Sequence, residues 1–293
     1  MYRSFKVDAA KLADKRFGQN FLKDHSIVDK IIEAMPKDGL PIVEIGPGLG
    51  DLTRQLIRVG YVRAYEVDKR LCDYLKSEFQ EPIKSGRLEL ICKDVLESGE
   101  SLYEGKYSLI ANLPYYIATK IILNALHDKQ CKTILVMVQK EVAQKFAAEC
   151  GSKEFGSLAI LAQSVADVEI LFDVPPEAFV PPPKVTSAIL SIKKRSSLED
   201  RGFEEFLKVI TQQPRKRAIK NLSTHYAKER VVELFTHLGL KPTLRPHEIE
   251  LSKYHQLYKE LIKDRGDESR TERETDTRES RDKTAAKKIA KSI

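Results

Sequence analysis

A glycine-rich segment follows the first apolar run of the chain, and acidic and amide residues follow the next three runs. Residues 44–50 read EIGPGLG, Glu66 and Asp94 follow the second and third runs, and Asn112 opens the sequence NLPYY. Glycines let the backbone approach a ligand closely, carboxylates accept hydrogen bonds, and an asparagine amide both donates and accepts them. These residue types together can bind a nucleoside and polarise an amino group.

The glycine segment differs from the dinucleotide fingerprint G-x-G-x-x-G. Pro47 lies between Gly46 and Gly48, and the third glycine follows after one residue. This departure disfavours a pyrophosphate site. We take Gly46 and Gly48 as cofactor-binding candidates because they lie between a strand and its helix.

Two carboxylates are placed to recognise the nucleoside. Glu66 lies twenty residues after Gly46. This is the sequence separation at which a carboxylate can accept hydrogen bonds from both ribose hydroxyls. Asp68 is an alternative for this role. Asp94 is placed to accept from an adenine amino group, although each acid alone is more often a solvated loop residue.

The NLPYY sequence suits chemistry at an adenine amino group, whose lone pair is delocalised into the ring. The Asn112 oxygen and a carbonyl of the Leu113-Pro114 turn can accept its two hydrogens, which favours a pyramidal nitrogen. Tyr115 can stack on the base, and Phe179 can cover its other face. The alternatives are an ordinary turn with a half-buried tyrosine and a packing role for Phe179.

Basic residues concentrate between positions 193 and 220, with nine Lys or Arg against four acids in a chain of net charge +7. Such residues can contact phosphates, which orients an RNA without reading its sequence. A solvated helix face is the alternative. The candidates are Lys193, Lys194, Arg195, Arg215, Lys216, Arg217 and Lys220.

Other kinds of site find no support. The four cysteines include no C-x-x-C pair, the six histidines show no H-x-x-x-H spacing, and no Ser or Cys lies in a nucleophile elbow. We therefore expect no metal, no covalent catalysis, and buried free thiols. With no long apolar run and no signal peptide in residues 1–11, we expect a soluble cytoplasmic protein and no membrane partner.

Apolar runs alternate with helical patterns, which predicts an α/β fold with a mostly parallel seven-stranded sheet covered on both faces. Helices are expected over 26–35 and 52–59, and the proline-rich stretch 174–185 must be a shaped loop. The predicted strands span residues 42–45, 62–67, 88–92, 108–111, 133–138, 159–165 and 187–192.

The pattern divides the chain into three parts. Residues 1–195 form the α/β domain, and residues 196–263 show helical spacing throughout, which predicts a small all-helical C-terminal domain. Residues 264–293 hold nine basic and eight acidic residues. With almost no large apolar groups, this tail is expected to be disordered or loosely helical.

Four segments resemble one family, the ribosomal RNA adenine dimethyltransferases. They are KRFGQNFL at 15–22, EIGPGLG at 44–50, NLPY at 112–115 and AFVPPPKV at 178–185, and the resemblance extends from Lys15 to Lys263. It implies a Rossmann-like domain that uses S-adenosyl-L-methionine. It further implies cofactor contacts from Asn20, Leu22, Gly46, Glu66, Asp94 and Asn112.

The resemblance also implies a substrate. Segments 213–217 and 245–257 are similar to enzymes that dimethylate two adjacent adenosines in the 3′-terminal hairpin of small-subunit (16S) rRNA, in a pre-30S particle. Pro214 and Lys120 depart from the commonest family pattern and put the RNA docking in doubt. The alternatives are a large-subunit rRNA methyltransferase of antibiotic resistance, a non-catalytic assembly factor and a small-molecule methyltransferase. A monomer is expected.

Overall fold

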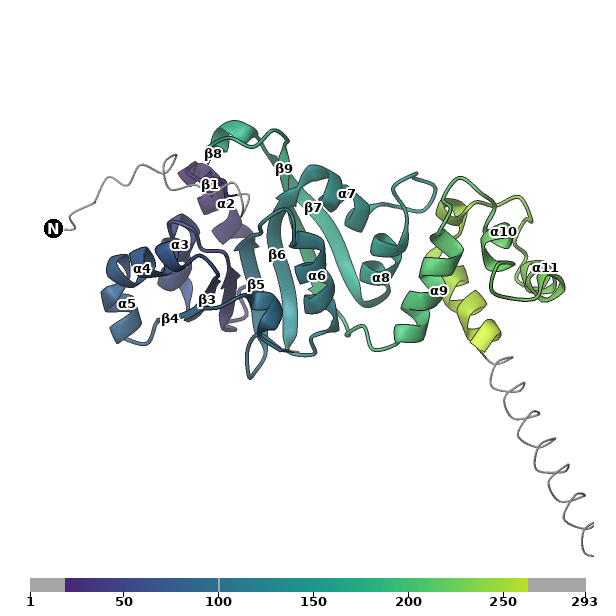
Figure 1. The fold of residues 1–293 in the computed structure, drawn as a ribbon, viewed down its shortest axis with the longest axis horizontal. Coiled ribbons are helices and arrows are strands. Elements are labelled where there is room, and N and C mark those ends of the chain that lie inside the picture. The colour runs from purple at the N-terminus through teal and green to yellow at the C-terminus, as the bar shows by residue number, and fades with distance from the viewer. Residues whose placement is uncertain (1–18, 100, 263–293) are drawn as a thin grey trace, which may run out of the picture. The chain divides into compact units, whose positions relative to one another are not determined.

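The computed structural model describes residues 19–99 and 101–262 (Figure 1). The chain separates into two compact units, Met1–Arg201 and Gly202–Ile293, whereas the sequence pattern divides it after residue 195. The predicted disordered tail, 264–293, lies outside the described residues. In the part that is described, no helix is long and apolar enough to cross a membrane.

A seven-stranded sheet forms the middle of the first unit, in the order β4-β3-β2-β5-β6-β9-β7 (Figure 1). Neighbouring strands from β4 to β6 are parallel, and β9 runs antiparallel to both β6 and β7. This confirms the predicted mostly parallel sheet. The strands are β2 (Ile42–Ile45), β3 (Val62–Glu66), β4 (Leu88–Cys92), β5 (Tyr107–Asn112), β6 (Cys131–Gln139), β7 (Ala166–Val174) and β9 (Ser187–Lys194).

Helices flank this sheet and bury their apolar faces against it. The predicted helix over 26–35 is present as α2, capped by Asp24, and α3 ends at Gly60 as predicted. Ile27, Val28 and Ile31 of α2 join the main core cluster. The helices of this unit are α2 (His25–Ala34), α3 (Asp51–Val59), α4 (Lys69–Glu78), α5 (Gln80–Lys84), α6 (Ala118–His127), α7 (Lys140–Ala147) and α8 (Ser157–Val165).

The predicted strand over 159–165 is wrong, because these residues belong to α8. Residues 159–162 are all apolar and buried, and so short an apolar run does not distinguish a strand from a core helix. The seventh strand, β7, begins at the next residue. Acidic residues occupy its positions 167, 169 and 173, which is the alternation of a strand with one solvated face.

The proline-rich stretch forms the 3₁₀ helix η3 (Pro176–Ala178) and the short strand β8 (Phe179–Val180). β8 pairs antiparallel with β1 (Phe21–Leu22), so Leu22 lies opposite Phe179. This small second sheet holds the segment before α2 against the proline loop.

The second unit is helical among its described residues. It contains α9 (Arg201–Thr211, which begins at the boundary), α10 (Ala218–Leu222), α11 (Lys228–His237), η4 (Pro246–Glu248) and a helix over 251–262. Phe203, Phe206 and Tyr254 belong to its aromatic core, in which Phe203 and Phe206 stack with ring centroids 6.1 Å apart. The short helix α10 follows the basic turn at 215–217.

The cysteines differ from the expectation of buried free thiols. Cys72 and Cys92 form a disulfide with Cα atoms 6.0 Å apart, Cys150 is exposed, and only Cys131 fits the expectation. Sequence spacing does not reveal the pair, because α4 and the end of β4 are brought together by the parallel crossover between β3 and β4.

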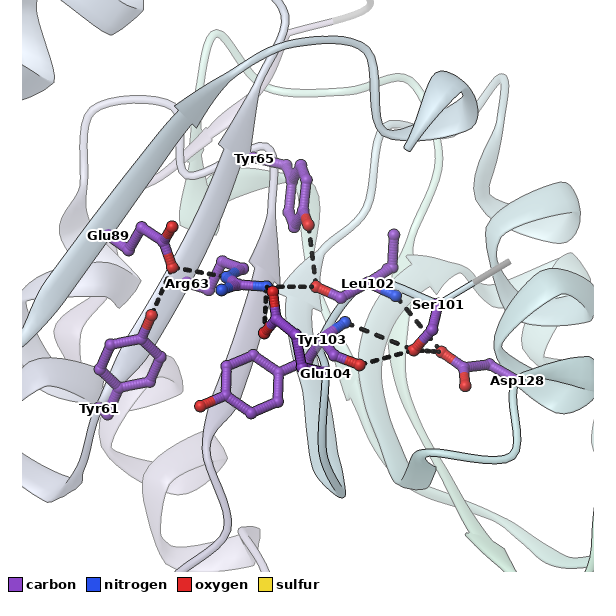
Figure 2. A network of polar contacts seen from close by, with 9 residues as sticks. All are labelled: Tyr61, Arg63, Tyr65, Glu89, Ser101, Leu102, Tyr103, Glu104 and Asp128. Atoms are coloured by element: carbon purple, nitrogen blue, oxygen red, sulfur yellow. Dashed lines mark hydrogen bonds and ion pairs between the residues drawn. The ribbon is translucent and has the colours of Figure 1, made fainter. Parts of the chain in front are cut away.

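A polar network fixes the loop 101–104, which precedes β5 (Figure 2). On one side, Arg63 of β3 donates to Glu89 at 2.6 Å and to the Leu102 carbonyl at 3.3 Å, and its guanidinium lies over the Tyr103 ring. On the other side, Asp128 accepts from Ser101 at 2.8 Å. The loop therefore has side-chain partners on both flanks.

Asp128 also accepts from the Tyr107 hydroxyl at 2.8 Å, so the loop is bound to the first residue of β5. Arg63 is only 12% exposed in its side chain, and charge-assisted hydrogen bonds at partly buried positions resist solvent screening. The network holds the segment between η2 (Val95–Glu97) and β5, and both of these elements contribute to the pocket described below.

Glu44 of β2 is a buried carboxyl group, only 1% exposed, that connects this strand to α3. It accepts a hydrogen bond from the Thr53 hydroxyl at 2.7 Å. Burial, aided by the neighbouring Glu66 and Asp51, raises the pKa of Glu44 to about 8, although the hydrogen bond from Thr53 lowers it. The group is therefore protonated at neutral pH and holds the glycine segment from within the core.

We predict that Glu44 makes the fold less stable as pH rises. The pKa of this group is 4.5 in an unfolded chain and about 8 in the fold. Between these two pH values the unfolded chain has released a proton that the folded chain retains. The free energy of unfolding therefore falls through this window. In Glu44→Gln, which keeps the hydrogen bond without ionising, the fall should be smaller by roughly 3 kcal/mol between pH 5.5 and 8.5.

Urea unfolding of both proteins at the two pH values measures this difference. Other titrating groups contribute equally to both proteins, so the comparison isolates Glu44. The same pH dependence in the two proteins would show that Glu44 is ionised in the fold.

Candidate active site

A pocket opens where β2, β3, β4 and β5 end. Parallel strands end at the same edge of a sheet, so residues that follow them meet there. Ten of the eleven residues predicted from the sequence to bind the cofactor or take part in catalysis line the pocket. They are Asn20, Leu22, Gly46, Gly48, Glu66, Asp94, Asn112, Leu113, Pro114 and Tyr115.

The glycine segment forms the base of the pocket. Gly46 and Gly48 have φ angles of +67° and +61°, values that residues with a Cβ atom rarely adopt. A Cβ at Gly48 would lie 3.0 Å from the Phe21 ring, and one at Gly46 would lie 3.5 Å from Pro114. Because neither position has a side chain, the backbone can lie close to Phe21 at Gly48 and to Pro114 at Gly46.

Glu66 ends β3 and faces the pocket from a buried position. Its Oε1 accepts from the backbone N–H of Asp68 at 2.9 Å, and its Oε2 accepts from that of Gly48 at 3.3 Å. Burial raises the pKa of Glu66, and these two bonds oppose the rise. The carboxyl group is thus connected directly to the glycine segment.

Asp68, the alternative to Glu66, has a different position. It caps α4 by accepting from the Arg70 backbone, and it forms an ion pair with the Arg70 side chain at 2.6 Å. The hydrogen bond from Arg70 lowers the pKa of Asp68. Asp68 does not line the pocket, so the geometry favours Glu66 as the pocket carboxylate.

Asp94 follows β4 and Asn112 ends β5, two strands that are separated by β3 and β2 in the sheet. Asp94 Oδ1 accepts from the Leu96 backbone at 2.9 Å, which caps η2 and fixes the carboxyl group. Asn112 Nδ2 donates to the Asn20 carbonyl at 3.4 Å. This bond orients the Asn112 amide and connects β5 to the segment before β1.

Tyr115 is half-buried, and its hydroxyl lies 2.6 Å from the Ser187 hydroxyl at the start of β9. Burial raises the pKa of Tyr115, so the phenol is neutral at physiological pH. The bond fixes the ring at one wall of the pocket. The next residue, Tyr116, is 60% exposed and also lines the pocket.

Phe179 is the candidate that the structure places elsewhere. It is only 2% exposed and belongs to the main core cluster, where β8 pairs with β1. This is the packing role that the sequence left open as the alternative. In this conformation its ring is not available to a base in the pocket.

Two basic residues at the end of β9, Lys194 and the following Arg195, have partners within the first unit. Lys194 Nζ donates to the carbonyls of Ala125 at 2.8 Å and Asp128 at 2.5 Å, and burial lowers the pKa of Lys194. Arg195 forms an ion pair with Asp167. Lys194 therefore completes the carboxyl end of α6 instead of presenting its charge to a phosphate.

Several other residues of the pocket were not predicted from the sequence. Val67 follows Glu66 and Tyr116 follows Tyr115, and both are exposed apolar residues at the lining. The one feature of the sequence that could have identified them is their position next to residues that were predicted. Among the described residues that line the pocket, Asp51, Glu66 and Asp94 are acidic and Lys93 is basic, while Glu44 is protonated and carries no charge. This balance suits a cationic ligand better than a phosphate.

Comparison with known proteins agrees with this geometry. The model of the ribosomal RNA adenine dimethylase family matches residues 10–263. "Ribosomal RNA small subunit methyltransferase A" of Sulfurimonas denitrificans is 53% identical over 262 residues, 89% of this chain and 98% of the relative. The protein of the same name from Campylobacter jejuni is 46% identical over 263 residues, 88% and 98% of the two chains.

Solved structures show the same architecture. A dimethyladenosine transferase from Plasmodium falciparum superposes with a TM-score of 0.72 at 24% identity, over 83% of this chain and 98% of the other. The 23S rRNA methyltransferase ErmE superposes with a TM-score of 0.64 at 25% identity, over 83% and 100%. The match over residues 10–263 shows that the chain belongs to the ribosomal RNA adenine dimethylase family, whose cofactor is S-adenosyl-L-methionine.

Proposed function

We propose that this enzyme dimethylates the amino groups of two adjacent adenosines in the 3′-terminal hairpin of small-subunit (16S) rRNA, within a pre-30S particle. The observation that carries the proposal is the common pocket. It combines the carboxyl groups of Glu66 and Asp94 with the amide of Asn112 and the turn that follows it. The names of the relatives that are about half identical support the small subunit as substrate.

The pocket residues suit S-adenosyl-L-methionine. In this proposal Glu66 holds the ribose hydroxyls, Asp94 holds the adenine amino group, and Asn20, Leu22, Gly46 and Gly48 complete the wall. The excess of acidic over basic lining residues complements the sulfonium and ammonium charges of this cofactor. When bound, the cofactor supplies a methyl group that is already activated by the positive sulfur.

The residues after β5 prepare the target amine. Asn112 Oδ1 accepts one amino hydrogen, because its Nδ2 is committed to Asn20. The Pro114 carbonyl accepts from the Ile117 backbone at 3.2 Å, so the Leu113 carbonyl is the better acceptor for the second hydrogen. Both bonds favour a pyramidal nitrogen with its lone pair directed outward.

Tyr115 provides a neutral, fixed ring for the base to stack on. The methylated nitrogen is a strong acid until it loses its proton to water, so no side chain is required as a strong base. Orientation of the two reacting atoms supplies most of the rate. We therefore propose that the reaction needs no metal. We also propose that the enzyme is a monomer of the cytoplasm.

The helical region, residues 196–263, is the RNA-binding domain of this proposal. Arg215, Lys216, Arg217 and Lys220 are exposed at or near the start of α10. No ion pair involving them is found among the described residues, so their charges are available to phosphates. Lys193 is exposed on the first unit and is a weaker candidate, and we leave Lys194 out because its charge is held by the end of α6.

Transfer of labelled methyl groups to purified RNA substrates tests the substrate assignment. Undermethylated small subunits and large-subunit RNA are each incubated with the enzyme, and nucleosides are then analysed for dimethyladenosine. We expect the product in small-subunit RNA alone. Product in large-subunit RNA would move the enzyme to the antibiotic-resistance type, and tight subunit binding without transfer would make it an assembly factor.

We predict that Asn112→Ala lowers kcat about a hundredfold, because one acceptor for the amino hydrogens is lost. The thermal unfolding midpoint should stay within about 2 °C, since the amide makes one long hydrogen bond. Asn124→Ala, at an exposed position of α6, is the matched control. Wild-type turnover in the Asn112 variant would exclude the amine-polarising role.

We also predict that the double variant Arg215→Glu/Lys216→Glu weakens RNA binding at least tenfold. The fall of the logarithm of the RNA association constant with the logarithm of the salt concentration should become shallower by about 1 to 2. Binding of S-adenosylhomocysteine should not change. Lys228→Glu/Lys259→Glu makes the same charge change at other exposed positions of the unit. Equal losses in the two double variants would show that net charge, and not this surface, binds the RNA.

A further inference from the structure

The disulfide between Cys72 and Cys92 lies beside the candidate cofactor site. Cys72 is in the first turns of α4 and is 1% exposed, whereas Cys92 is the last residue of β4 and is exposed. The bond therefore joins the helix after β3 to the end of the adjacent strand. One sulfur is shielded by the core, and the other can be reached from solvent.

Both cysteines contact the residue that we propose to hold the ribose. Cys72 Sγ lies 3.4 Å from the backbone carbonyl oxygen of Glu66. Cys92 is the register partner of Glu66 across the β3–β4 pair, and it precedes Asp94 by two residues. Glu66 and Asp94, the two acids that we propose to bind the cofactor nucleoside, thus lie next to the two cysteines that the disulfide joins.

The hydrogen bonds of the two acids do not join α4 to β4. Glu66 is held by N–H groups of Gly48 and Asp68, and Asp94 is held by its own cap of η2. None of these bonds connects the Glu66 segment to the Asp94 segment. Among the described residues, the strand pairing also joins these segments, as do the contacts of Glu89 with Tyr61 and Arg63, which lie at the other end of the strands. The disulfide is the side-chain connection next to the two acids.

We propose that Cys72 and Cys92 form a reversible thiol–disulfide pair that tunes cofactor affinity, with the disulfide form binding the cofactor nucleoside more tightly. The proposal rests on the cofactor site proposed above. Disulfides of proteins in a reducing compartment are usually transient or redox-sensing. The exposed sulfur of Cys92 gives a small thiol or disulfide access to the pair.

The oxidant is a low-molecular-weight disulfide. The Cys92 thiolate attacks one of its sulfurs, which breaks the S–S bond of the oxidant and releases the first small thiol. Cys72 then loses its proton and attacks Cys92 in the mixed disulfide, which releases the second small thiol. Two protein thiols are oxidised, one small disulfide is reduced to two thiols, and the two protons end on the released thiols.

Reduction also creates a new donor at this site. The Cys72 thiol can donate to the Glu66 carbonyl, which its sulfur already approaches. The restraint between α4 and β4 is lost at the same time. A pocket whose two acids are fixed by a bond loses less conformational freedom on binding than one whose acids move independently.

The experiment uses the full chain, equilibrated in mixtures of reduced and oxidised glutathione. Titration calorimetry with S-adenosylhomocysteine should give a Kd about fivefold lower for the oxidised protein. Alkylation followed by intact-mass measurement gives the oxidised fraction. Because the coupling is reciprocal, S-adenosylhomocysteine should raise the disulfide equilibrium constant by the same factor.

Three variants complete the test. Cys92→Ser, at the exposed position, and Cys72→Ser should each have the Kd of the reduced protein in every redox mixture. Cys150→Ser should keep the redox dependence. No disulfide in any mixture, or equal or weaker binding by the oxidised protein, would overturn the proposal.

A fourth variant separates this proposal from the site assignment. Glu66→Gln should weaken binding of S-adenosylhomocysteine in both redox states, because it removes a proposed ribose contact. Unchanged affinity in this variant would refute the cofactor site. The other outcome is that Glu66→Gln weakens binding but the wild-type affinity is the same in both redox states. That result would refute only the cysteine proposal.

Discussion

The parallel direction of β2, β3, β4 and β5 is the constraint on which the site depends. It brings the ends of four separate strands to one edge of the sheet, where Glu66, Asp94 and Asn112 line a single pocket. Next to this edge the core contains a carboxyl group, because Glu44 is buried and protonated where it connects β2 to α3. The network around Arg63 then holds the loop that leads into β5.

Patterns that depend on local chemistry could be predicted from the sequence. Six of the seven predicted strands are present, because their apolar runs are short and bounded by polar turns. Residues that follow a strand in an α/β fold share an edge, so eight of the site candidates could be grouped from their positions in the sequence. The other two that line the pocket, Asn20 and Leu22, were predicted from the family resemblance alone. The choice between Glu66 and Asp68 required the three-dimensional arrangement, since only there is Asp68 seen to cap a helix.

Features that depend on long-range packing could not be predicted. Residues 159–162 form a short run that is apolar on every side, so their period does not separate strand from helix. The burial of Phe179 follows from pairing with a segment more than 150 residues away, and the contacts of Lys194 follow from the position of α6. The Cys72–Cys92 bond joins residues of different elements with no local motif.

A crystal structure of the full chain with S-adenosylhomocysteine tests the central claim most directly, because it locates the cofactor relative to each strand end. The account predicts the ribose hydroxyls within hydrogen-bond distance of the Glu66 carboxylate, the adenine amino group at Asp94, and the sulfur on the side of Asn112. A nucleoside bound with its ribose away from Glu66, or in a different pocket, would contradict it.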